Sequence, residues 1–163
     1  MAVDHITAHG MNSINDSVFI DTNILLYAYD RDAGVKHETA KKLIQQCWEK
    51  AIGVISIQVL CEFFVGATRT GRSIISLEEV ESIIRNLSYN WRVISPDVQM
   101  VMEAIRGRME HQFSFWDALI WAAAKRAGVK GIYTEDFQSG QIVEGVEFNN
   151  PFKVGNKLSN LPN

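Results

Sequence analysis

The chain has few cysteines, few prolines, no long apolar run and no excess of positive charge. Its two cysteines, Cys47 and Cys61, lack the spacing of a metal or redox site, so we expect buried, reduced thiols in a cytoplasmic protein. The longest uncharged apolar stretch of the C-terminal half, 118–124, is far shorter than the roughly 20 residues that cross a bilayer. Since no basic leader with an apolar segment opens the chain, we expect neither a secretory signal nor a membrane span.

The formal net charge of −3 also limits the function. It argues against a protein that coats nucleic acid by bulk electrostatics, although it does not exclude a nuclease. With 163 residues, of which 47% are hydrophobic, the chain suits one compact domain with a substantial core. We expect this domain at 17–150, between a flexible extension at 1–16 and a loosely attached tail at 151–163.

Short apolar runs alternate with helical patterns along the chain. The runs that are typical of buried strands lie at 18–20, 53–56, 91–94, 131–134 and 146–148. Helical patterns lie between them at 22–29, 37–50, 57–70, 76–87, 96–109 and 115–127. This alternation predicts an α/β sandwich around a parallel sheet, with ligands bound beyond the carboxyl ends of the strands.

Four carboxylates interrupt the apolar segments. Asp21 and Asp136 each follow a predicted strand, Glu62 lies in the helix after the second strand, and Asp117 begins a very apolar helix. A carboxylate costs several kcal/mol to remove from water unless it is paired or binds a metal. Two such charges about 4 Å apart repel by roughly 4 kcal/mol at an effective dielectric of about 20. We therefore hypothesise an oxygen-ligated Mg²⁺ or Mn²⁺ site of the kind that cuts phosphodiesters.

Each acid also has an ordinary structural explanation. Asp21 could cap the helix that follows it, and Ser114 with Asp117 fits a capping-box pattern. Glu62 could be a surface glutamate, and Asp136 could be an ordinary turn residue. The metal hypothesis therefore depends on all four acids lying together at one site in the fold.

The motifs around these acids resemble, in order and spacing, those of the PIN-domain family. They are Phe19-Ile20-Asp21-Thr22-Asn23, the isolated Glu62 after Ser56, Phe115-Trp116-Asp117-Ala118, and Tyr133-Thr134-Glu135-Asp136. More narrowly, they look like the VapC-type toxins of bacterial toxin–antitoxin pairs. The resemblance implies a three-layer α/β/α sandwich with a five-stranded parallel sheet. It also implies a Mg²⁺- or Mn²⁺-dependent endoribonuclease that forms a homodimer and is inhibited by a cognate antitoxin protein.

The motif match also assigns roles to particular residues. The acidic cluster and metal ligands would be Asp21, Glu62, Asp117 and Asp136. The neighbours that orient this cluster would be Thr22, Asn23, Ser114 and Thr134. Glu135 could substitute for Asp136 or assist it, and the number of bound ions stays open.

Two other functions are compatible with part of the pattern. The chain could be a non-catalytic module that recognises RNA or a protein, although retention of all four acids argues against this. It could also transfer phosphoryl groups through an aspartyl-phosphate on Asp21. Such haloacid-dehalogenase-like sites need a second Asp two residues on, where this chain has Asn23.

Basic and aromatic residues near the acids are less specific. The candidate contacts to RNA phosphates are Lys36, Arg69 and Arg72. The helical spacing of Phe63, Phe64, Phe115 and Trp116 favours core packing over base stacking. His111 lies close in sequence to Ser114, and we expect a structural or surface role for it.

Overall fold

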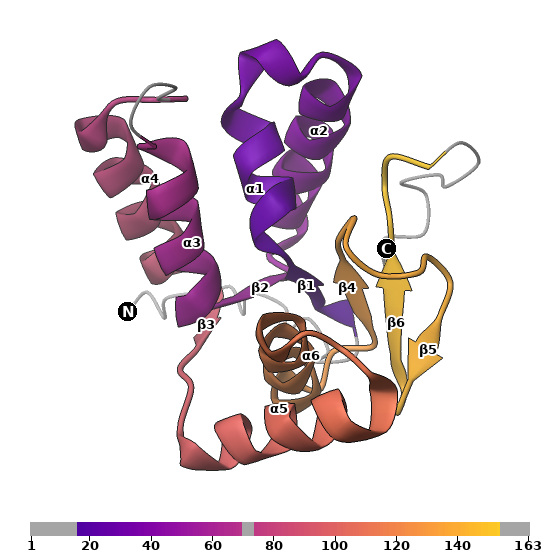
Figure 1. Cartoon of the computed structure of the whole chain (residues 1–163). Helices are drawn as coiled ribbons and strands as arrows, with labels where there is room; N and C mark the ends of the chain where they lie inside the picture. Colours follow the sequence, from indigo (N-terminus) through magenta and orange to yellow (C-terminus); the bar gives the residue numbers. More distant parts are fainter. Residues whose placement is uncertain (1–15, 70–73, 154–163) are drawn as a thin grey trace, which may run out of the picture.

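A six-stranded sheet is the middle layer of the computed structural model, which describes residues 16–69 and 74–153 (Figure 1). The strand order is β3 (Arg92–Ile94), β2 (Gly53–Ser56), β1 (Val18–Ile20), β4 (Gly131–Tyr133), β6 (Val146–Asn149) and β5 (Ile142–Val143). The first five strands are parallel, as predicted. The sixth strand, β5, is an addition to the prediction: it is two residues long and pairs antiparallel with β6.

Helices cover both faces of the sheet, which confirms the three-layer α/β/α architecture (Figure 1). One face carries α1 (Thr22–Tyr29), α2 (Val35–Lys50), α3 (Ile57–Ala67) and α4 (Leu77–Asn90). The other face carries α6 (Phe115–Ala127), with α5 (Val98–His111) packed on its outer side. Gly107 permits this close packing, because a Cβ atom there would lie 2.7 Å from the ring of Trp121.

Local capping signals decide where the helices begin and end. Ser76 forms a capping box with Glu79 at the start of α4. Asp97 caps α5, since its side chain accepts a hydrogen bond from the backbone N–H of Met100, so the helix begins two residues later than the predicted 96. Gly128 ends α6 with a φ of 70°, a conformation that glycine adopts without strain. A short 3₁₀ helix, η2 (Arg31–Ala33), occupies the loop predicted after α1.

Two expectations from the composition can be compared with the structure. The prediction of two buried thiols holds for Cys47, whose burial raises its pKa to about 12, but it is wrong for Cys61, which is exposed on α3. The apolar neighbours of Cys61 in sequence do not cover it, because they point to other sides of the helix. Within 16–69 and 74–153, no helix has the length and apolar character that crossing a membrane requires.

The ends of the chain fall outside this description. Most of the predicted extension at 1–16 and of the tail at 151–163 lies outside the described residues, as does Arg72.

Candidate active site

Asp21 lies at the junction between β1 and α1 and is only 5% exposed. Its Oδ1 accepts a hydrogen bond from the backbone N–H of Thr22 at 2.7 Å, and its Oδ2 accepts one from the hydroxyl of Thr134 at 2.7 Å. The pKa of Asp21 is raised to about 7, mainly by burial and to a smaller extent by the negative charges of Asp136 and Glu62, against the lowering effect of the hydrogen bonds from Thr134 and Thr22. The capping role is therefore real, yet it leaves a buried acid that ionises only with difficulty.

Residues after β4 meet Asp21 because β4 is the parallel neighbour of β1. The Thr134 hydroxyl that donates to Asp21 also accepts from the backbone N–H of Asp136 at 3.1 Å. The Asn23 amide donates to Asp136 Oδ2 at 2.8 Å and to Asp21 Oδ2 at 3.5 Å. Asn23 and Thr134 thus link the two aspartates from opposite sides.

Glu62 enters the same network from α3. Its Oε2 accepts from the Thr22 hydroxyl at 2.8 Å, and its Oε1 accepts from the Gln58 amide at 2.8 Å. The same Gln58 nitrogen donates to the backbone carbonyl of Trp116, 3.2 Å away, at the start of α6. We did not predict Gln58 as a site residue, although its position one helical turn before Glu62 would have placed both on one face.

Asp117 stands in the first turn of α6. The Ser114 hydroxyl donates to Asp117 Oδ2 at 2.6 Å and accepts from the backbone N–H of Asp117 at 3.2 Å, so the predicted cap forms. Partial desolvation raises the pKa of Asp136, and the charges of Asp117, Glu135 and Glu62 raise it further. The charge of Asp117 therefore acts on Asp136, while the hydrogen bonds of Asp117 within the described residues join it to Ser114.

Within residues 16–69 and 74–153, no cation is paired with these four acids. The ion pairs found in the described part of the chain include none of Asp21, Glu62, Asp117 and Asp136. Their partners are hydroxyl, amide and backbone groups, which orient a carboxylate without neutralising it. The site therefore concentrates negative charge.

Glu135 has a different environment from its neighbour Asp136. Its two oxygens accept from the Tyr27 hydroxyl at 2.6 Å and from Lys36 Nζ at 2.5 Å. Lys36 also donates to the Tyr27 hydroxyl at 3.0 Å and lies over the Tyr27 ring. Glu135 is thus already paired with a cation, and Lys36 is committed to that pair. Of the other predicted phosphate contacts, Arg69 is exposed just after α3.

The donor set fits a hard divalent cation. Mg²⁺ and Mn²⁺ prefer carboxylate, amide and water oxygens as ligands. The side-chain oxygen of Asn23 is buried and has no hydrogen-bond partner in the structure, although such an unsatisfied group costs about 1–3 kcal/mol. An unsatisfied oxygen on the residue that bridges the carboxylates of Asp21 and Asp136 is an arrangement that a bound cation would stabilise.

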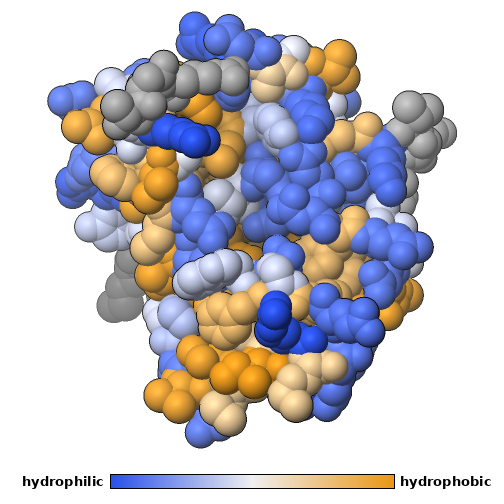
Figure 2. All heavy atoms as spheres, viewed as in Figure 1, coloured by the Kyte–Doolittle hydropathy of each residue, from blue (hydrophilic) through white to orange (hydrophobic). Residues whose placement is uncertain are grey.

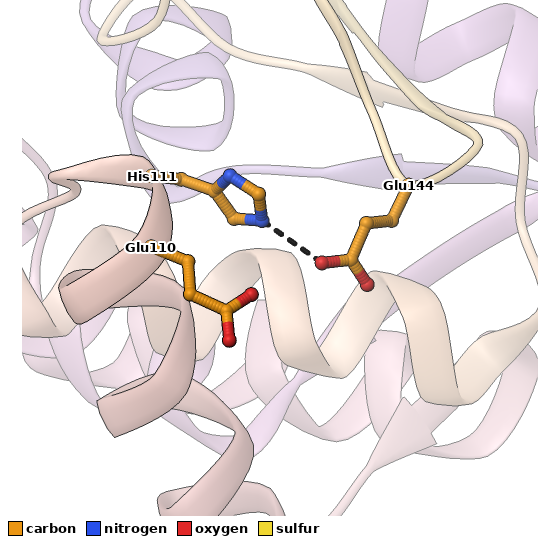
Figure 3. Close-up of side chains that lie close together, drawn as sticks. All are labelled: Glu110, His111 and Glu144. Atoms are coloured by element: carbon orange, nitrogen blue, oxygen red, sulfur yellow. Dashed lines mark hydrogen bonds and ion pairs between the residues drawn. The ribbon is translucent and has the colours of Figure 1, made fainter.

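A second cluster of possible ligands consists of Glu110, His111 and Glu144, whose ligand atoms lie within 4.8 Å of one another (Figure 3). Here, however, cations of the protein already occupy the carboxylates. Arg106 donates to both Glu144 oxygens at 2.8 and 2.9 Å and to Glu110 at 2.5 Å, while Lys125 donates to Glu144 at 2.6 Å. These bonds lower the pKa of Glu144. We interpret this cluster as an ion-pair network in which His111 has a structural role.

The aromatic residues divide between the core and the surface. Phe63 is fully buried and Phe115 packs against the core, as expected. The expectation of core packing is wrong for Phe64 and Trp116, which are 42% and 61% exposed. The helical pattern placed these residues near one another without showing which side of the helix is covered.

A separate cavity of about 610 Å³ opens between α1, α2 and α4. Its apolar lining includes Tyr29, Ile44, Trp48 and Ile83, and its basic side chains are those of Arg31, His37 and Lys41. None of the four clustered acids lines it, so this cavity is distinct from the acidic site.

Known proteins show the same fold. The sequence matches the family model of the PIN domain over residues 18–141, whereas no curated protein matches it significantly. Among solved structures, the Mycobacterium tuberculosis toxin VapC20, described as sarcin-ricin loop cleaving, is 23% identical with a TM-score of 0.58, covering 74% of this chain and 90% of that one. A toxin–antitoxin complex from Klebsiella pneumoniae is 21% identical with a TM-score of 0.60, and the match covers 85% of this chain and 100% of that one. DNA-bound VapBC from Salmonella typhimurium is 17% identical with a TM-score of 0.59, and the match covers 83% of this chain and 98% of that one.

Proposed function

The chain belongs to the PIN domain family, and from this premise we propose that it is a metal-dependent endoribonuclease, the toxin of a toxin–antitoxin pair. The observation that carries the proposal is the convergence of Asp21, Glu62 and Asp136, with Asp117 in electrostatic reach, at the carboxyl end of the parallel strands. Structural neighbours that are toxins or toxin–antitoxin complexes support the biological role.

Asp21 and Asp117 are the proposed direct ligands of Mg²⁺ or Mn²⁺, and Glu62 and Asp136 would bind directly or through water. When bound, the ion would lower the pKa of a coordinated water and stabilise negative charge on the scissile phosphate. No side chain needs to form a covalent bond with the substrate. We assign the fourth position to Asp136 rather than Glu135, because Lys36 already neutralises Glu135.

The residues around the acids position them without cancelling their charge. Thr22 and Gln58 hold the two oxygens of Glu62, which limits the rotation of that carboxylate. Thr134 and Asn23 do the same for Asp21 and Asp136. Because all of these donors are neutral, the cluster keeps the charge that a dication requires.

The RNA backbone would approach this charged site through exposed basic residues. Arg69 remains a proposed phosphate contact, since it is exposed, and Arg72 stays a prediction outside the described residues. Lys36 is less available to a phosphate than the sequence predicted. It would have to release Glu135 before it could bind a phosphate.

We propose a second copy of the chain as the partner of α5. Val98, Met102, Ile105 and Met109 recur at helical spacing and are 72%, 57%, 40% and 77% exposed. In Figure 2 apolar side chains gather over this helix, on the face that the view presents. An exposed apolar stripe of this kind is typical of an interaction surface, and homodimerisation would cover it.

The cavity between α1, α2 and α4 is the proposed contact for the antitoxin. Its aromatic and aliphatic lining suits the apolar side of a peptide segment, while Arg31, Lys41, Glu49 and Glu79 give its edge both signs of charge. Burial of Trp48 and Tyr29 by such a segment would supply much of the affinity, because aromatic residues commonly dominate binding energy at interfaces.

Cleavage of single-stranded RNA with and without EDTA tests the proposed activity. We expect Mg²⁺- or Mn²⁺-dependent cleavage by the native sequence and no cleavage in EDTA. Asp117→Asn should lose the activity while keeping its melting temperature, and Glu110→Gln is the matched control outside the site. Binding without cleavage would instead favour the non-catalytic module, and formation of an acid-stable phospho-aspartate would favour phosphoryl transfer.

A further inference from the structure

An exposed tryptophan stands beside the proposed catalytic acids. Trp116 lies in the first turn of α6, directly before Asp117, and is 61% exposed. The ring of Phe115 touches its edge, with 5.3 Å between ring centroids, and leaves much of the indole open to solvent. The other three tryptophans are buried or half-buried, with Trp91 at 6% and Trp121 at 0%. Large exposed aromatic rings are uncommon on proteins unless they contact another molecule.

Gln58 anchors the backbone of Trp116 to the acidic site. The Gln58 amide donates to the Trp116 carbonyl at 3.2 Å and, from the same nitrogen, to Glu62 at 2.8 Å. The backbone of Trp116 is therefore tied to the carboxylate of Glu62 on α3 and, through the helix, to Asp117. The indole therefore projects from backbone that is anchored beside the proposed site.

The charges of the protein also favour a contact that does not depend on ion pairing. Without its cation the acidic site would repel phosphates, and several cations of the protein are already paired with acids. Lys36 binds Glu135, Lys125 binds Glu103 and Glu144, and Arg126 binds Asp97. Stacking of bases on an aromatic ring supplies affinity that tolerates most sequences and needs no positive charge.

We propose that Trp116 stacks on an unpaired base next to the scissile phosphate of the RNA, an inference that rests on the proposed ribonuclease function. A base inside a duplex already has neighbours on both faces, so the site would select single strands, loops or bulges. The indole would hold the nucleotide equally in the ground state and in the transition state. Its loss would then raise KM and leave kcat nearly unchanged.

Steady-state cleavage of a labelled single-stranded RNA of mixed sequence tests this proposal in the full chain. Base stacking on an aromatic residue corresponds to an increase in KM of between about 5-fold and about 140-fold for Trp116→Leu, with kcat within about 3-fold. Trp116→Phe should recover part of the loss, because phenylalanine keeps an aromatic face while leucine keeps only apolar volume. Tyr89→Ala removes another aromatic residue, 79% exposed at the end of α4, and should leave both constants unchanged.

The outcomes separate this inference from the function on which it rests. Cleavage by all variants with an unchanged KM for Trp116→Leu would overturn stacking, leave the nuclease intact and assign the exposed ring to a protein interface. Equal loss in Trp116→Phe and Trp116→Leu would also overturn stacking. Absence of metal-dependent cleavage by the native sequence would overturn the proposed function, and the inference with it. Melting temperatures of the variants verify that each is folded.

Discussion

Replacement of Asp21 by asparagine should stabilise the metal-free protein and abolish the cleavage that the metal-loaded protein performs. Asparagine has nearly the same shape as aspartate and can still accept the hydrogen bond from the backbone N–H of Thr22. It carries no charge, so the cost of burying a carboxylate near Glu62 and Asp136 disappears. A residue that served only as a helix cap would gain nothing from this change.

The pKa of Asp21 sets the size and the pH range of the effect. Because the pKa rises on folding, from 3.8 to about 7, the folded protein binds the proton more tightly than the unfolded chain. Stability therefore falls as the pH rises from about 4 to about 7. The full pKa shift corresponds to a loss of roughly 4 kcal/mol in the free energy of unfolding, which is an upper limit. Because the site can relax, we expect Asp21→Asn to recover about 1–3 kcal/mol. For a domain of this size, that is a rise in melting temperature of roughly 2–10 °C.

Denaturant unfolding of the native sequence and of Asp21→Asn in EDTA, at several pH values, measures this difference. We expect no difference near or below about pH 4, and a difference in favour of the variant that grows up to about pH 7. The comparison between the two proteins cancels the titration of distant groups such as Glu144. If Asp21→Asn were less stable by the same amount at every pH, Asp21 would be a structural cap and the argument from buried charge would fail.

Three further substitutions test other parts of the acidic site. Glu62→Gln should preserve the stability of the metal-free protein or raise it by up to about 1 kcal/mol near neutral pH, because it removes one repelling charge. A large loss of melting temperature in EDTA would contradict this expectation. Asp136→Asn should reduce RNA cleavage by about 10- to 100-fold or more, whereas Glu135→Gln should change it by less than about 3-fold, because Glu135 is paired with Lys36 rather than held in the cluster. The reverse order in a cleavage assay would identify Glu135 as the fourth acid.

The sequence predicted the parallel strands and the positions of the acids well, for physical reasons. A buried strand such as β1 must be a continuous apolar run, and a parallel sheet brings the residues after neighbouring strands to one edge. Asp21 and Asp136 could therefore be placed near each other from the pattern alone. By contrast, β5 has only two residues, too few for any periodicity, and its pairing depends on the turn at Glu144 and Gly145.

Contacts between side chains far apart in the sequence could not be predicted in the same way. Lys36 and Glu135 are 99 residues apart, and nothing in the local pattern shows that they pair. Helical periodicity shows which residues share a side of a helix, but not whether another element covers that side. For this reason Phe63 was correctly expected in the core, while Trp116 was not recognised as exposed.

Binding of Mn²⁺ by the folded protein, measured by calorimetry near pH 8, tests most directly whether the four acids form a cation site. We expect the native sequence to bind Mn²⁺, Asp117→Asn to lose at least about 10-fold in affinity, and Glu110→Gln to bind like the native sequence. Unchanged binding by Asp117→Asn, or loss of binding in Glu110→Gln, would contradict the account. In the second case, the cluster that we interpret as an ion-pair network would be the metal site instead.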